Sequence, residues 1–243
     1  DTLSVLKDQE LYSKEVSKRR GETTQTYHGV FASHPSNDLR FQEIVTKAES
    51  LNDNPSKNLE GKYLAFIDGI TYGDSEASGV RRGRDFYHGK LNLHLRAPEN
   101  WEIVNSPGVL YFYSSKRHAS MSLTVTDQNK RESPSQYLDR NLSGIILDRS
   151  IMQLDGYEAV SSLIENSGEK FRVAIIFKDK NIFQLVGRME EHSTDFSLFD
   201  KQFISIISSF SKLEVSEKEL SKALSIKLYK VRKGETYKTL ASN

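Results

Sequence analysis

The 243-residue sequence contains no cysteine. This absence excludes disulfide bridges, thiolate zinc sites and cysteine nucleophiles together. It leaves the compartment open, because proteins without disulfides occur on both sides of membranes. No apolar run approaches the ~20 residues of a transmembrane helix. A signal peptide is also lacking and the first residue is Asp1 rather than Met, so we expect a processed or excised chain whose true beginning lies upstream.

An excess of charge of one sign is lacking as well. Lys and Arg total 34 and Asp and Glu total 33, which gives a net charge of +1. This near-neutrality argues against a nucleic-acid partner bound by bulk charge. Hydrophobic residues make up 37% and charged residues 28%, a composition that is typical of globular proteins with a hydrophobic core. The length exceeds one typical domain and falls short of three.

The common catalytic signatures are absent from the sequence. A His-Glu-x-x-His zinc helix needs two histidines four residues apart, and no pair here has that spacing. There is no Gly-x-Ser-x-Gly elbow and no phosphate-binding glycine loop. His94 alternates with Leu93 and Leu95, so we expect it on the solvent face of a strand. A solvated or hydrogen-bonded role is favoured for five of the six histidines: His28, His88, His94, His118 and His192.

Helical spacing dominates the first third of the chain. The segment from Leu3 to Arg20 is typical of a helix that lacks its start, and a second amphipathic helix follows the capping residues Ser36 to Asp38. Leu59 to Ile70 repeats the helical spacing after a break at residues 52–58, and a polar loop from Gly73 to Gly83 marks a domain boundary. The second helix has its apolar residues at spacings of three and four: Phe41, Ile44, Val45, Ala48 and Leu51.

After Gly83 the hydrophobic period changes to two, which is typical of half-buried strands. Ser133 and Pro134 begin a helix that we extend to Ile145, and Thr194 or Asp195 caps a helix with one wide apolar face. Strands joined by short turns predict an antiparallel sheet flanked by helices, an α+β fold. The expected strands cover residues 91–97, 101–104, 109–113, 121–125, 151–154, 157–164, 171–177, 182–186 and, after a charged connector at 214–222, residues 226–231.

One short stretch carries candidate chemistry. His34 precedes Pro35 at a predicted helix entrance, and Arg40 follows six residues later. An imidazole and a guanidinium placed in this way can be aimed together at an anion or an oxyanion. On spacing alone, a capping loop with a surface salt-bridging arginine is favoured.

At this stretch the sequence resembles a known family. Val5 to Glu10, then Tyr27 to Pro35 with Arg40, are similar to the end of the catalytic domain in the HtpX, BepA and CAAX-prenyl-protease family of zinc metallopeptidases (metallopeptidase family forty-eight). The resemblance places the His-Glu-x-x-His helix and the third ligand, a Glu, before Asp1. It implies zinc in the intact parent, none in this chain alone, and no peptidase activity of this chain alone. It also implies that His34 approaches the metal as a gate ligand, or the substrate, and that Arg40 supports the reacting carbonyl.

The resemblance extends through most of the chain. Tyr63 to Asp74 and Gly79 to Arg84 look like the segment after the peptidase domain in secreted bacterial members. Leu93 to Trp101 is similar to the opening of small PsbP- or Mog1-like domains. Asp155 to Ala159 resembles a turn of the same extension, and Ile226 to Ala241 looks like the start of a LysM module that stops at Asn243.

These patterns predict four parts: the helical end of a peptidase domain (1–58), a helix and linker (59–83), a PsbP/Mog1-like α+β domain (84–213), and a charged connector with a partial LysM-like segment (214–243). We expect the non-catalytic C-terminal region of a periplasmic or envelope-associated bacterial metalloendopeptidase. It would complete the peptidase fold, with the missing catalytic half and protein substrates as partners. The alternative is a stand-alone envelope module that binds peptidoglycan through its LysM-like tail. An upstream His-Glu-x-x-His distinguishes the two.

Overall fold

The structure is a computed structural model that describes residues 59–128, 130–190, 195–236 and 240. The helices predicted over Leu3 to Arg20 and over residues 38–51 lie outside the described residues, as does the first predicted domain, 1–58. Within the described part, no helix is long and apolar enough to cross a membrane.

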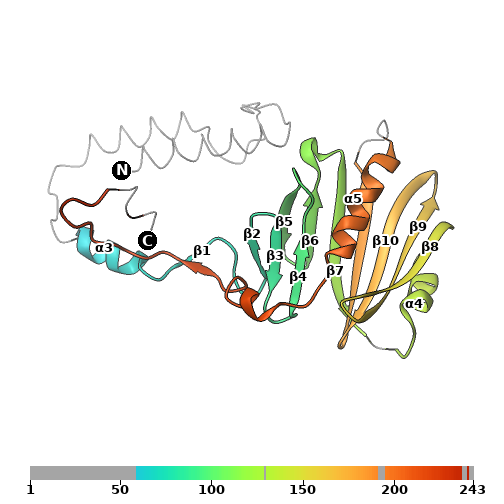
Figure 1. Cartoon of the computed structure of the whole chain (residues 1–243), viewed down its shortest axis with the longest axis horizontal. Helices are drawn as coiled ribbons and strands as arrows, with labels where there is room; N and C mark the ends of the chain where they lie inside the picture. The colour runs from blue at the N-terminus through green and yellow to red at the C-terminus, as the bar shows by residue number, and fades with distance from the viewer. Residues whose placement is uncertain (1–58, 129, 191–194, 237–239, 241–243) are drawn as a thin grey trace, which may run out of the picture.

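One large antiparallel sheet forms the centre of the molecule (Figure 1). Its strand order is β5-β6-β7-β11-β10-β9-β8, so hairpins lie on both sides of the β7–β11 pair that joins them. The predicted α+β class, with an antiparallel sheet flanked by helices, is confirmed. The strands are β5 (Glu102–Ser106), β6 (Val109–Tyr113), β7 (Ala119–Asp127), β8 (Ile145–Leu154), β9 (Tyr157–Asn166), β10 (Glu169–Lys178) and β11 (Asn181–Met189).

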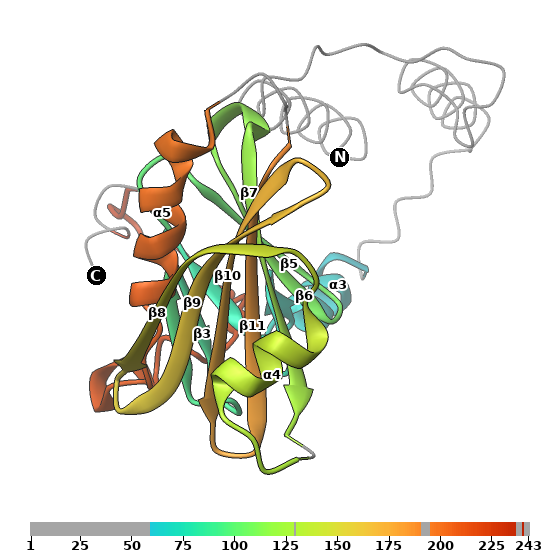
Figure 2. The ribbon, with the colours of Figure 1, turned by 90° about the vertical axis from the view of Figure 1, so that its right-hand side faces the viewer.

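The two helices of this domain cover opposite faces of the sheet (Figure 2). On β10, Ala174 and Ile176 face the cluster that includes α5 (Phe196–Ser208), whereas Val173 and Ile175 face the cluster that includes α4 (Pro134–Asn141). The strand is apolar on both faces because each face is covered. Ser133 caps α4 in a reciprocal capping box with Gln136, and Asp195 caps α5.

A second, three-stranded sheet closes the α5 side of the core. It consists of β2 (Val80–Arg82), β3 (Asp85–His88) and β4 (Leu93–Arg96) in that order. Phe86, Leu93 and Leu95 belong to the same buried cluster as α5. The main core therefore lies between the two sheets and α5.

Two short strands join segments that lie far apart in the sequence. β1 (Thr71–Tyr72) pairs with β12 (Leu224–Ser225), and the pairing is extended by hydrogen bonds between Gly69 and Ile226 and between Ile226 and Ile70, both 2.8 Å. The helix α3 (Leu59–Ile67) precedes β1. Both ends of the α+β domain thus leave it side by side (Figure 1).

Three sequence predictions differ from the structure. Residues Val80–Arg82, which the sequence analysis assigns to a loop, form strand β2. A tight turn at Gly83 (φ 62°) folds this segment onto β3. The domain boundary expected at Gly83 therefore falls inside the β2–β3 hairpin. Ile145 begins β8 instead of ending α4, because Gly144 at φ 138° turns the chain after the helix. The strand expected at 226–231 is absent; the strand at this place is β12 (Leu224–Ser225), directly before it, which pairs with the two residues of β1.

Candidate functional site

The two residues predicted to carry chemistry, His34 and Arg40, lie outside the described residues. The described part instead contains a pocket that the sequence did not predict. We call it the His88 pocket. It has a volume of about 270 Å³ and opens where the three-stranded sheet diverges from strands β5, β6 and β7. Its lining residues are Ala77, Ser78, Phe86, His88, Leu91, Leu93, Asn105, Ser106, Pro107, Gly108, Val109, Leu110, Leu123 and Val125.

The wall beside β2 depends on one glycine. Gly79 has φ +85°, and a Cβ added there would lie 2.3 Å from the ring of Phe86, so a side chain is excluded by both conformation and space. The amide of Asn105 on β5 donates to the carbonyls of Ser78 (2.9 Å) and Gly79 (3.1 Å). These bonds fix the rim of the pocket against the edge of the large sheet.

The wall beside β3 carries the imidazole for which the pocket is named. Burial lowers the pKa of His88 below its ordinary value, so the neutral ring is favoured. Nδ1 of the neutral ring accepts a hydrogen bond from the Leu91 N–H at 3.4 Å. The Leu91 carbonyl in turn accepts from the buried Nζ of Lys178 at 2.9 Å. Lys178 on β10 therefore anchors the loop that contains Leu91 and bounds the pocket.

The chemistry of the His88 pocket favours binding of an apolar group. Leu93, Leu110 and Leu123 are each at most 5% exposed and form its floor. At ~30 Å³ per water-sized group, its volume holds roughly nine heavy atoms, the size of one large side chain. Ligand pockets of proteins are generally apolar with a few polar groups that set orientation. Here the polar groups near the opening are those of His88, Asn105 and Ser78.

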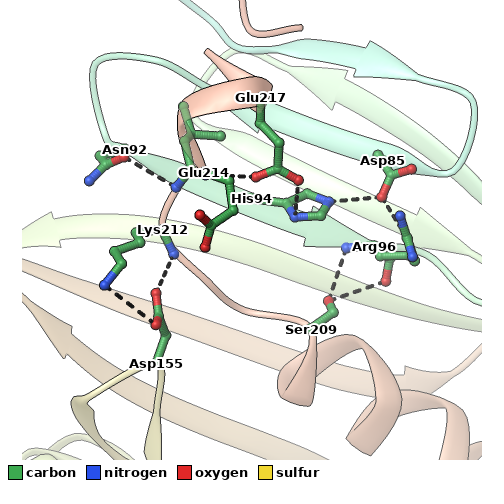
Figure 3. A network of polar contacts seen from close by, with 10 residues as sticks. Asp85, Asn92, His94, Arg96, Asp155, Ser209, Lys212, Glu214 and Glu217 are labelled. Carbon is green, nitrogen blue, oxygen red and sulfur yellow. Dashed lines mark hydrogen bonds and ion pairs between the residues drawn. The ribbon is translucent and has the colours of Figure 1, made fainter.

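A second polar cluster lies on the outer face of the small sheet (Figure 3). His94 stacks on Tyr87 with ring centroids 4.7 Å apart, and its Nε2 lies 2.8 Å from Asp85 Oδ1. Its Nδ1 lies 3.3 Å from Glu217 Oε1, on the connector after α5. The solvent-facing position predicted for His94 is wrong, because the connector covers this face and leaves its side chain 12% exposed. Of the two roles that the sequence analysis allowed for His94, the structure shows the hydrogen-bonded one.

This cluster fixes the connector rather than forming a reactive site. His94 and Ser211 exchange backbone hydrogen bonds of 2.8 and 3.1 Å, and the Lys212 N–H donates to Asp155 at 2.8 Å. Burial alone would raise the pKa of Asp85, but hydrogen bonds from Arg96 and His94 outweigh it and lower that pKa. Both imidazole nitrogens face carboxylates, so the ring is already engaged. Among the described residues, no group of His, Asp and Glu is placed to hold a metal ion.

No protein-family model matches the sequence and no curated protein matches it. Solved structures do match. The solution structure of cyanobacterial PsbP from Synechocystis is 12% identical, with 60% of this chain and 94% of that chain covered and a TM-score of 0.37. LpqN from Mycobacterium tuberculosis, described as involved in cell envelope biogenesis, is 14% identical, with 49% and 82% covered and a TM-score of 0.36.

A third match, a crystal structure from Bacteroides thetaiotaomicron, is 12% identical with a TM-score of 0.37, and the alignment covers 62% of this chain but 51% of that chain. A PsbP structure is thus among the solved structures that match. None of the three bears on the peptidase portion or on the LysM-like tail.

Proposed function

We propose that this chain is the non-catalytic C-terminal region of a bacterial cell-envelope zinc metalloendopeptidase. Its α+β domain positions protein substrates or partners by holding an apolar side chain in the His88 pocket. The observation that carries the binding role is the pocket itself, with its apolar floor, its neutral imidazole and a size suited to one large side chain. The resemblance of Tyr27 to Pro35 and Arg40 to the metallopeptidase family supports the peptidase context.

In this proposal the reaction centre belongs mainly to the residues before Asp1. Zinc, when bound there, activates water and polarises the scissile carbonyl. This chain contributes Arg40, a permanent charge suited to a developing oxyanion, and His34, which donates a hydrogen bond or occupies the open metal position. The α+β domain binds the polypeptide at a distance from the reaction. Remote binding of this kind lowers KM without being needed for bond cleavage.

The test is peptide cleavage by the intact parent with variants at the rim of the pocket. Ala77 is exposed and lines the opening, so Ala77→Trp places an indole across it. Ser75 is exposed on the same loop and does not line the pocket, and its hydroxyl donates to Ser78 Oγ at 3.2 Å. Ser75→Trp is therefore the control for added bulk and for loss of that contact, without an indole across the opening. Losing the burial of one apolar side chain corresponds to ~1.5–3 kcal/mol, or a KM raised roughly 10–100-fold with kcat unchanged.

An unchanged KM in Ala77→Trp, or an equal effect in Ser75→Trp, contradicts a substrate role for the pocket. The peptidase context is tested separately by Arg40→Ala, which should lower kcat by roughly 10²–10³, the usual effect of removing an oxyanion donor. His34→Ala should lower activity similarly, or raise it if His34 acts as a gate. A coding sequence without His-Glu-x-x-His upstream of Asp1 would contradict the peptidase context altogether.

A further inference from the structure

The segments that enter and leave the α+β domain expose an unusual share of apolar surface. We define the stalk as residues 63–72 together with 224–233, joined by the β1–β12 pairing; it projects away from the two sheets (Figure 1). Seventeen large apolar side chains are exposed in the described part of the chain, and nine of them lie on the twenty residues of the stalk. These nine include every exposed aromatic side chain of the described part: Tyr63, Phe66, Tyr72 and Tyr229. A concentration of this kind marks an interaction surface.

Hydrogen bonds join the two segments of the stalk to each other and to the α+β domain. Besides the β1–β12 ladder, the Leu228 N–H donates to Asp68 Oδ1 at 3.0 Å. The Arg82 guanidinium on β2 donates to the Lys222 carbonyl at 2.7 Å, where the stalk meets the small sheet. Segments about 160 positions apart in the sequence are thereby held side by side. The exposed side chains of both segments therefore belong to one surface.

The same surface has an excess of positive charge. Its basic side chains are all exposed: Lys227, Lys230, Arg232 and Lys233. Its one carboxylate is Asp68, so four cations and one anion give the stalk a net charge of +3, against +1 for the whole chain. Exposed apolar residues separate the first three cations along the chain, which interleaves the charge with the apolar area. A partner that fits this surface offers an apolar phase and negative charge at the same boundary.

We propose that the stalk binds the surface of a lipid bilayer that carries anionic headgroups. Aromatic side chains are favoured at the boundary between headgroups and acyl chains, and tyrosine offers both an apolar ring and a polar hydroxyl there. Lysine and arginine lay their aliphatic stems along the apolar layer while their charges reach the headgroups. A nucleic acid would match the charge of the stalk but leave its apolar side chains in water. This inference is independent of the His88 pocket and of the peptidase context.

The test is sedimentation of the 243-residue chain with two sets of vesicles, one of phosphatidylglycerol mixed with phosphatidylcholine and one of phosphatidylcholine alone. We expect binding to the anionic set, and we expect added salt to weaken it because the cations are exposed. Lys230→Glu changes the charge by two units and should lower the affinity roughly 25-fold, at about five-fold per charge. Phe66→Ser removes the most exposed aromatic ring and should lower the affinity at least about five-fold.

Two matched control variants lie outside the stalk. Ile151 on β8 is 79% exposed, against 78% for Phe66, so Ile151→Ser removes an apolar side chain of equal exposure. Lys201 on α5 is exposed, so Lys201→Glu makes the same change of charge as Lys230→Glu. Both controls should bind the anionic vesicles as the unchanged chain does. Every substituted side chain is exposed, so all four variants should keep the fold, which circular dichroism checks.

Three results overturn the proposal. The first is equal binding to the two sets of vesicles, and the second is an equal loss of binding in a stalk variant and its control. The third is binding that depends on Lys230 but not on Phe66, which would make a soluble polyanion the partner. A stable dimer that Phe66→Ser dissociates in velocity sedimentation also overturns it, because a second copy of the chain would then cover the stalk.

Discussion

The close approach of the Phe203 ring to Gly187 allows a prediction about the packing of α5 on the sheet. The ring of Phe203 on α5 is fully buried and lies edge-on to Trp101 at a centroid distance of 5.9 Å. Beneath it, a Cβ added to Gly187 on β11 would lie 2.7 Å from two atoms of that ring. Gly187 does not have a positive φ, so the glycine is required there by space alone. The helix and the sheet meet at this point.

Phe203→Ala should therefore lower the free energy of unfolding by about 3–5 kcal/mol, through lost burial and the cavity that remains. Gly187→Ala alone should lower it by ~1–3 kcal/mol, because the new methyl group overpacks the ring. In the double variant the methyl enters the cavity, so the total should be smaller than the sum by ~1–3 kcal/mol. Urea unfolding followed by far-ultraviolet circular dichroism measures all four proteins. Free-energy changes that simply add in the double variant would refute the packing of Phe203 against Gly187.

Further predictions concern charge, acidity and boundaries. Arg172→Leu should lower unfolding free energy by about 3 kcal/mol in urea titrations, because it leaves Asp200 unpaired beside the core. Since folding lowers the pKa of His88, the unfolded chain binds more protons, and stability should fall as pH drops below 6.5; His88→Gln should flatten that slope in melts from pH 7 to 5. Residues 74–222 should unfold more cooperatively than 84–213, which lacks β2, in calorimetric scans. Calorimetry should show no stoichiometric zinc bound by this chain alone.

Local patterns predicted most elements of the α+β domain. Asp155 to Ala159 resembles a turn, and its first two residues, Asp155 and Gly156, have the positive φ, 49° and 84°, that a tight two-residue hairpin requires. Ser133-Pro134 predicted the start of α4, and Asp195 was one of two proposed caps for α5. These turn and capping residues lie within a few positions of the elements that they start or end, so they can be recognised from the sequence alone.

Features that depend on distant segments could not be predicted in this way. The periodicity of β7 does not reveal that it pairs with β11, which is separated from it by α4 and three strands. The His88 pocket combines residues from Ala77 to Val125, and its histidine has no local feature that distinguishes it from a solvated one. The nearest signal was Gly79, a glycine directly before the apolar Val80. The pairing of β1 with β12 joins residues about 150 positions apart.

The most direct test of the central claim is binding of an apolar side chain by the His88 pocket. The 243-residue chain with labelled methyl groups is titrated with the neutral probe N-acetyl-phenylalanine amide and followed by nuclear magnetic resonance. The account predicts saturable shifts at Leu93, Leu110 and Leu123, and their loss in Ala77→Trp but not in Ser75→Trp. Shifts that do not saturate, or that persist in Ala77→Trp, would contradict it.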